Sequence, residues 1–144
     1  MPANIQNPRN LPGNTQAQQP ANVRFRRSPE YKETYLTKVN PYESVRNKFR
    51  EFMELKRNDP NQAFGKSDKH FLGDGFFTQQ VPGLKHAHIT SDLSIVYKIS
   101  GKNPTEIYLY GFYTHDELGT GQPPNIRRQS SVAKSFRSYT FTEE

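Results

Sequence analysis

The chain has 144 residues and carries 20 Lys and Arg against 14 Asp and Glu, which gives a formal net charge of +6. This length is typical of one domain, and the absence of cysteine excludes disulfides, thiol catalysis and cysteine-bound zinc. No segment approaches the roughly 18 apolar residues of a membrane span, and the first residues lack the apolar core of a Sec signal peptide. The positive excess indicates a polyanionic partner, most often a nucleic acid.

Residues 1–30 differ in composition from the rest of the chain. They hold five of the 11 prolines, many Asn and Gln, and one aromatic residue, Phe25. We predict a disordered arm, because so few apolar side chains cannot offset the entropy lost on ordering. Four arginines against one glutamate give the arm a charge of +3. Its basic run, Arg24, Arg26 and Arg27, is either a solvated linker or a segment that binds phosphate or a partner.

The remaining residues, 31–144, show the patterns of a folded domain. Alternation of Tyr, Thr and Val predicts a strand over 31–39, and Asn40-Pro41 is typical of a helix start. In chain order we then expect a helix ending at 59–60 and a loop-like region over 61–85. Three strands should follow, over 86–90, 93–99 and 106–113, with a turn at 90–92 between the first two. A last helix, capped by Asn125, should end the domain. This order predicts an α+β domain with helices packed on a twisted antiparallel sheet.

Four histidines are the most informative residues for chemistry. His86 and His88 lie two apart on a predicted strand, so they share one face of it. Asp92 follows His88 across the turn, close enough to orient an imidazole. His115 comes directly after the strand over 106–113, and His70 lies in a glycine-rich loop.

Clusters of His and Asp either bind a metal ion or act as a metal-free acid–base pair. The chain has no helical His-x-x-x-His and no tight carboxylate cluster, so we expect neither a metal nor a cofactor. A partial ligand set of His86, His88 and Asp92 remains the alternative.

Two imidazoles that flank a phosphodiester suit RNA cleavage. One removes the proton of the ribose 2′-hydroxyl, and the other protonates the leaving 5′-oxygen. A nearby cation must stabilise the negative charge that develops on the phosphate, and Lys85, Arg127 and Arg128 are the candidates.

Residues 86–118 resemble the C-terminal half of RelE-superfamily toxins, especially the YafQ branch. The matching features are a His, three residues and an Asp (His88 and Asp92), an apolar strand LSIVYKI (93–99), a strand that ends in THDEL (114–118) and, more loosely, the loop HFLG (70–73). The resemblance covers roughly residues 31–118.

The resemblance implies a small endoribonuclease with the RelE-like fold that cuts messenger RNA in the ribosomal A site. Its partners are then mRNA, the ribosome and a cognate antitoxin protein, in the cytoplasm of a bacterial or phage-infected cell. It assigns acid–base and positioning roles to His70, His88, Asp92 and His115, and we expect His88 to couple with Asp92 while His115 opposes them.

The same resemblance indicates RNA contacts around these residues. The family commonly places an aromatic residue where this chain has Gly119, so Tyr113 or Phe112 is expected to serve as the stacking platform instead. We expect RNA contacts from Lys85, His86, Tyr97, Tyr113, Arg127 and Arg128. The pair Phe76-Phe77 is either core or an exposed loop tip that stacks on RNA or a partner.

Other functions fit the same residues. The chain could be a non-catalytic module of this fold that binds RNA, ribosome or protein, either phage-encoded or structural. It could also be a bacteriocin-type ribonuclease that acts on free RNA.

Overall fold

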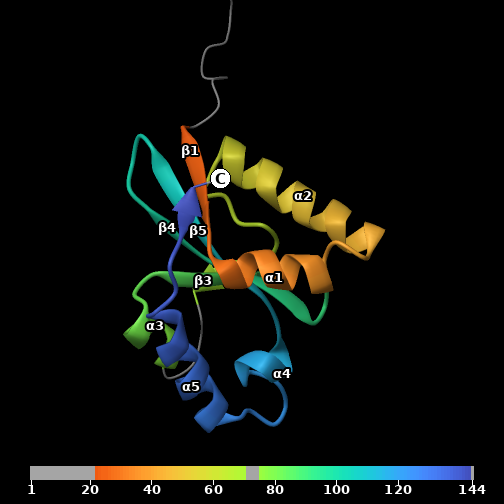
Figure 1. The fold of residues 1–144 in the computed structure, drawn as a ribbon, viewed down its shortest axis with the longest axis vertical. Helices are drawn as coiled ribbons and strands as arrows, with labels where there is room; N and C mark the ends of the chain where they lie inside the picture. The colour runs from red at the N-terminus through yellow and green to blue at the C-terminus, as the bar shows by residue number, and fades with distance from the viewer. Residues whose placement is uncertain (1–21, 71–74, 144) are drawn as a thin grey trace, which may run out of the picture.

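The computed structural model describes residues 22–70 and 75–143, and Figure 1 shows how they are arranged. Strands and helices alternate irregularly along the chain. They are β1 (Val23–Arg27), α1 (Pro29–Lys38), α2 (Glu43–Asn58), β2 (Lys69–His70), α3 (Phe76–Gln80), β3 (Leu84–His88), β4 (Leu93–Ser100), β5 (Thr105–Thr114), α4 (His115–Leu118), α5 (Ile126–Phe136) and β6 (Thr142–Glu143). No helix in 22–70 or 75–143 is both long and apolar enough to cross a membrane.

The six strands form one sheet in the order β2-β3-β4-β5-β1-β6. Strands β2, β3, β4 and β5 pair antiparallel with one another, as expected. Strand β1 runs parallel to β5, and β6 runs antiparallel to β1. The predicted α+β class is therefore confirmed, but the sheet is mixed rather than purely antiparallel. The predicted turn at 90–92 does join β3 to β4.

The arm predicted over 1–30 is wrong for residues 22–30. Strand β1 pairs along its whole length with β5, and the Phe25 side chain is buried. The Arg57 guanidinium covers the Phe25 ring at 5.2 Å, and Arg26 forms an ion pair with Glu106. A strand of five residues with three arginines carries too weak an alternation to be recognised without its partner strand. Residues 1–21 lie outside the described residues.

The strand predicted over 31–39 is a helix. Its start is stabilised by the hydroxyl of Ser28, which accepts a hydrogen bond from the Tyr31 amide, with Pro29 at the first helical position. Tyr31, Tyr35 and Val39 recur every four residues and pack into the core. The apolar spacing of four therefore outweighs the β propensity of Tyr, Thr and Val.

The next helix, α2, begins at Glu43 rather than at Asn40-Pro41, which lie in a turn. Its apolar face buries Phe49, Phe52 and Met53, and it ends before Asp59 as expected. Residues 61–68 and 81–83 are loop, as predicted, but the range predicted as loop also contains β2, α3 and the start of β3.

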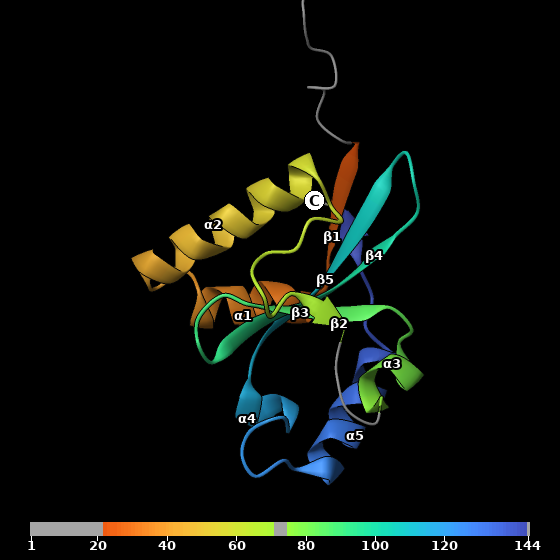
Figure 2. The ribbon, with the colours of Figure 1, turned by 180° about the vertical axis from the view of Figure 1, so that it is seen from behind.

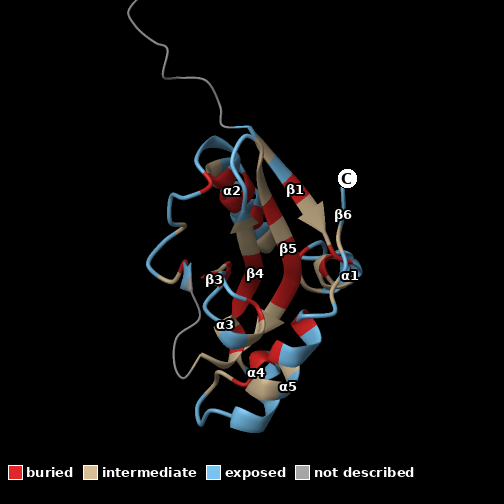
Figure 3. Ribbon diagram, turned by 90° about the vertical axis from the view of Figure 1, so that its left-hand side faces the viewer, coloured by how far each residue is buried: buried red, intermediate tan, exposed pale blue. Residues whose placement is uncertain are grey.

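Two apolar clusters cover opposite faces of the sheet. Adjacent residues of β5 alternate between them: Ile107 and Leu109 pack against α1 and α2, whereas Tyr108 and Tyr110 face α3 and α5. Figure 2 shows α1 and α2 together at one end of the molecule and α3 and α5 together at the other. Buried residues run along β4 and β5 between them (Figure 3). Phe77 of α3 is buried in the second cluster, so the Phe76-Phe77 pair is not an exposed loop tip.

The segment after β5 turns back through a short helix, α4, that the sequence analysis missed. Thr114 and Glu117 form a capping box at its start, and Gly119 ends it with a left-handed backbone (φ +77°). Asn125 then caps α5, as predicted, by accepting a hydrogen bond from the Arg128 amide. Gly119 lies so close to α5 that a Cβ there would be 2.6 Å from the Asn125 carbonyl oxygen.

Replacing Gly119 with alanine is therefore expected to destabilise the protein by about 2 kcal/mol, from backbone strain and steric overlap together. Gly65 is the matched control, because its φ of +80° is similar while nothing lies within 4 Å of a Cβ built there. We expect Gly65→Ala to cost about half as much. Urea unfolding of both variants measures the difference, and equal costs would contradict the close packing of α5 on Gly119.

Candidate active site

A cleft of about 770 Å³ opens between the β3–β4 side of the sheet and the segment that runs from α4 into α5. One wall comes from β2, β3, β4 and the loop before β2, and the other comes from residues 115–129. The lining residues are Lys66, Ser67, Lys69, His86, His88, Ser94, His115, Leu118, Thr120, Gly121, Gln122, Pro124, Ile126 and Gln129.

Three of the four histidines line this cleft in a row. His86 and His88 share the face of β3 that also bears Leu84 of the second cluster, as the spacing of two predicts. The ring centroids of His86 and His88 are 6.0 Å apart. The His115 ring lies 5.1 Å from that of His88 and nearly perpendicular to it. The structure therefore brings together His86, His88 and His115.

Asp92 pairs with His115, not with His88 as predicted. Its Oδ1 accepts a hydrogen bond from the backbone amide of His115 at 3.0 Å. In the tautomer that carries a proton on Nδ1, the imidazole donates a second hydrogen bond to the same oxygen at 2.8 Å. The β4–β5 register explains the pairing, because Leu93 lies opposite Thr114 and thereby sets Asp92 opposite His115. These two hydrogen bonds hold the pKa of Asp92 below its usual value, so its carboxylate stays charged beside the imidazole.

The other two imidazoles are biased toward the neutral form. Burial lowers the pKa of His86 to about 4, with a further contribution from the charge of His88. Burial, and then the charge of His115, also lowers the pKa of His88, although Asp92 opposes this. Near pH 7 the row therefore holds two neutral imidazoles beside a third that a carboxylate orients.

The loop before β2 and β2 itself supply the cations of the cleft. Lys66 and Lys69 line it, and Lys69 lies opposite His86 in the sheet. Ser67 accepts a hydrogen bond from the backbone amide of His88 at 3.1 Å, which ties the loop to β3. These residues do not stand out in the sequence, because nothing in a segment of mixed composition indicates which lysines lie next to the histidines.

Lys85 and Tyr97 lie on the opposite face of the sheet from the histidines. Tyr97 is fully buried, and its hydroxyl donates to Asp68. The Lys85 ammonium lies 5.8 Å from the centre of the Tyr97 ring. The predicted RNA contact by Tyr97 is wrong, since its ring is in the core, and Lys85 does not reach the cleft.

Of the two predicted stacking platforms, one is buried and the other is half-buried. Phe112 is fully buried in the first cluster. The Tyr113 hydroxyl is 2.7 Å from that of Tyr139, and its ring packs against Phe136. Burial and the bond to Tyr139 raise the pKa of Tyr113. Phe112 therefore offers no free face for a base, and that alternative is wrong. The ring of Tyr113 is half-buried, and its contact with RNA stays a prediction.

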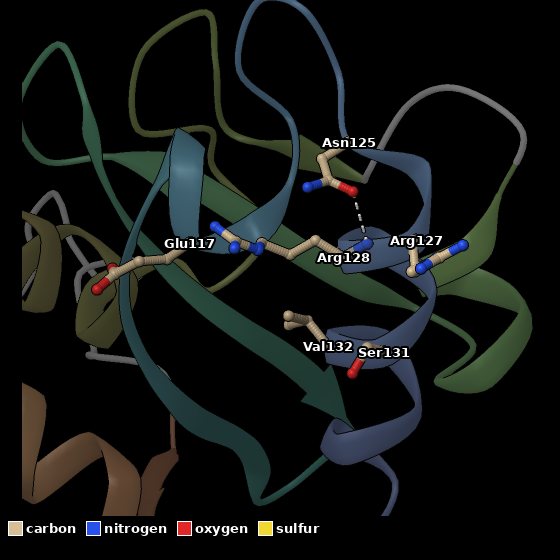
Figure 4. Close-up of a pocket in the computed structure, with 6 residues that line it drawn as sticks. All are labelled: Glu117, Asn125, Arg127, Arg128, Ser131 and Val132. Carbon is tan, nitrogen blue, oxygen red and sulfur yellow. Dashed lines mark hydrogen bonds between the residues drawn. The ribbon is translucent and has the colours of Figure 1, made fainter.

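Arg127 and Arg128 lie outside the histidine cleft, on a separate groove of about 450 Å³ at the start of α5. Figure 4 shows their side chains pointing in different directions. The Arg128 guanidinium donates to the backbone carbonyl of Asp116 at 3.1 Å and to its carboxylate at 3.3 Å. The structure does not bring the two arginines to the histidines, although both arginines belong to α5, which also forms part of one wall of the cleft.

The three arginines predicted to form a binding arm lie in β1, and each contacts a residue of another element. Arg26 donates to Glu106 at 2.7 Å, Arg24 lies 3.8 Å from Glu143, and Arg27 covers the ring of Tyr31. Strands β4 and β5 separate β1 from β3, which carries His86 and His88. The position of the three arginines therefore does not support their predicted role as a binding arm.

The backbone of His70 lies in β2 opposite Lys85, but its side chain is outside the described residues. Within the ranges that the structure describes, no group of three or more His, Asp and Glu residues is arranged to hold a metal ion.

Two further residues of the cleft were missed. Ser94 lies opposite His88, and the predicted turn at 90–92 already implied this pairing, because 88 and 94 are equally far from its centre. Gln129 reaches the cleft from α5, which no local pattern could indicate because it depends on how the helix packs on Gly119.

No family model and no curated protein matches this sequence. Solved structures with a similar fold include the YoeB/ParE toxin from Agrobacterium tumefaciens, with a TM-score of 0.52 and 16% identity over 64% of this chain and 98% of that one. The DinJ-YafQ toxin-antitoxin complex from E. coli aligns with a TM-score of 0.51 and 20% identity over 67% and 97%. A YafQ mutant from E. coli aligns with a TM-score of 0.50 and 19% identity over 65% and 94%.

These similarities establish the fold. Nearly the whole of each toxin chain aligns with about two thirds of this one. The chain therefore has the fold of the YoeB/ParE and YafQ toxins, as the sequence resemblance predicted.

Proposed function

We propose that the chain is an endoribonuclease toxin of the RelE superfamily, similar to YafQ, that cuts messenger RNA on the ribosome without a metal ion. The observation that carries this proposal is the Asp92–His115 pair, with the His88 ring 5.1 Å from that of His115 in an open cleft. The arrangement offers the two proton-transfer groups that RNA cleavage requires.

In the proposed reaction His88, which is neutral, removes the proton of the ribose 2′-hydroxyl. The 2′-oxygen attacks the adjacent phosphorus, and the bond from phosphorus to the 5′-oxygen breaks. His115, oriented by the hydrogen bond between its Nδ1 and Asp92, gives a proton to the leaving 5′-oxygen. Lys66 and Lys69 stabilise the negative charge on the phosphate oxygens. The products are a 2′,3′-cyclic phosphate and a free 5′-hydroxyl.

The partners follow from this proposal and from the fold. One of the structures with this fold is a toxin-antitoxin complex, and we extend that arrangement to this chain as a cognate antitoxin that binds it. The site of action is then the bacterial or phage-infected cytoplasm, where mRNA and ribosomes are available.

Primer extension on a translated message tests the proposal. The wild-type protein should produce discrete cleavage products, and His88→Ala should remove them. Lys85→Ala is the control, because Lys85 is a cation one strand position before His86 but on the opposite face of β3. Equal cleavage by His88→Ala and wild type would contradict the site. Cleavage of naked RNA without ribosomes would favour the bacteriocin-type alternative.

The pH dependence of cleavage is a further prediction. A base acts only when neutral, and the pKa of His88 lies below the usual 6.5 for histidine. The acidic limb of the kcat/KM profile, which reports protonation of His88, should therefore fall below pH 6.5. Initial rates from pH 4.5 to 9 measure this. An acidic limb above pH 7 would contradict the role of His88 as the base.

A further inference from the structure

The second wall of the cleft comes from the C-terminal segment, which docks through Gly119. A Cβ at that position would lie 2.6 Å from the Asn125 carbonyl oxygen and 2.8 Å from the Gln129 amide nitrogen. Only a glycine permits this approach. It brings the side chain of Gln129 to the cleft, where its amide nitrogen donates to the Gly119 carbonyl at 2.8 Å. The Gln129 side-chain oxygen has no partner among the described residues and can accept a hydrogen bond.

Across the cleft, the hydroxyl of Ser94 has no hydrogen-bond partner in the part of the chain that the structure describes. Only 2% of this residue is exposed, yet it lines the cleft. Its oxygen is not fully buried, so the small exposed part includes the hydroxyl, which opens on the cleft. A hydroxyl at a cleft wall without a protein partner can both donate a hydrogen bond to a ligand and accept one from it. Ser94 shares its sheet face with His86 and His88.

We propose that this cleft binds one base of the RNA next to the cleaved phosphate, with Ser94 and His86 contacting it from the sheet and Gln129 from α5. The proposal rests on the ribonuclease function above and adds the specificity determinants. Leu118 and Ile126 supply apolar surface for the faces of the base. Serine and neutral histidine each both donate and accept hydrogen bonds, and the Gln129 oxygen accepts them. An exocyclic amino group has two N–H donors, one for the Gln129 oxygen and one for Ser94, whereas uracil has a single ring N–H, so a base with an amino group fits better than uracil.

The charge distribution favours a base over a second phosphate. At pH 7 the three contacting side chains are uncharged, because the pKa of His86 is about 4. The cations of the cleft, Lys66 and Lys69, come instead from the loop before β2 and from β2 itself. Phosphate recognition and base recognition are thus assigned to different elements.

Binding of deoxytetranucleotides, which have no 2′-hydroxyl and cannot be cut, tests the base site separately from catalysis. Fluorescence anisotropy should show tighter binding of adenine, cytosine or guanine tetramers than of the uracil tetramer. Ser94→Ala and Gln129→Ala should each weaken the preferred tetramer by about 5–10-fold, as expected for one lost hydrogen bond, and should change uracil binding less than twofold. Ser100→Ala on the same strand and Ser131→Ala on the same helix, both exposed, are the matched controls.

Thermal unfolding distinguishes a binding role from a structural one. Ser94→Ala removes a hydroxyl with no partner, so its Tm should equal or exceed that of the wild type, which makes this variant decisive even if Gln129→Ala unfolds. If the wild type cuts RNA while both variants bind every tetramer as it does, the base site is wrong and the ribonuclease stands. If the wild type discriminates between tetramers but cuts no RNA, the base site stands and the ribonuclease is wrong.

Discussion

Replacing His115 with alanine is expected to lower the rate of RNA cleavage by about 10²–10⁴-fold, the usual contribution of one general acid or base. Its ring is fixed at the cleft by Asp92, with Nδ1 2.8 Å from the carboxylate, so that Nε2 is left for the substrate. Single-turnover cleavage of a fluorescent message measures the loss. Asp116→Asn is the matched control, because Asp116 is the next residue and its side chain is 92% exposed. A rate for His115→Ala within threefold of the wild type would contradict the assignment.

The partner of Asp92 can be identified by combining variants. Asp92 acts through His115 in this structure, so Asp92→Asn should slow cleavage by less than His115→Ala does. In the His115→Ala background, Asp92→Asn should cause no further loss, because the group that it positions is already absent. In the His88→Ala background, by contrast, it should still slow cleavage. The opposite pattern would restore the pairing of Asp92 with His88 that the sequence alone suggests.

That mistaken pairing shows what limited the sequence analysis of the site. The residue types and their strands were predicted correctly, since His86 and His88 share a face by simple alternation. Distance along the chain suggested that Asp92 would orient His88. The register between β4 and β5 decides otherwise, because Asp92 lies opposite His115, 23 residues further on. Register depends on long-range pairing that no local pattern encodes.

The errors in the fold have the same origin. Residues 31–39 have strand propensity, but the cap at Ser28 and the spacing of Tyr31, Tyr35 and Val39 favour a helix against β5. Residues 23–27 are too short and too basic to predict a strand alone, and they become one because β5 offers a free edge. Strands β4 and β5 and helix α5 were predicted well, since each has a full period of apolar residues and a turn or cap at its end.

The largest effect on stability is expected at the buried pair of Lys56 and Asp68. Both side chains are fully buried, with 2.6 Å between the ammonium and the carboxylate. Asp68 also accepts hydrogen bonds from the Tyr97 hydroxyl and the Phe64 amide. Burial alone would raise the pKa of Asp68, but the hydrogen bonds from Lys56, Tyr97 and the Phe64 amide outweigh it and hold that pKa below its usual value. Burial lowers the pKa of Lys56, although Asp68 opposes this.

Replacing Asp68 with alanine leaves a charged lysine buried without its partner, so we expect a loss of about 3–5 kcal/mol in the free energy of unfolding. Urea denaturation measures it. Glu51→Ala is the control, because the pair of Lys48 and Glu51 is exposed, with 3.8 Å between the charged atoms, and should contribute less than about 0.5 kcal/mol. A cost for Asp68→Ala no larger than for Glu51→Ala would contradict the buried network.

A double variant separates charge from hydrogen bonding. Lys56→Met with Asp68→Asn removes both charges and keeps an acceptor for Tyr97, so it should recover most of the lost stability. Because the folded pKa of Asp68 is depressed, its contribution is present above the ordinary value of 3.8 and is lost as the pH falls further. Wild type and Asp68→Asn should therefore converge in stability below that pH. Asp68 also fixes the loop that carries Lys66 and Ser67 into the cleft, so Asp68→Asn should slow cleavage at neutral pH even where the protein remains folded.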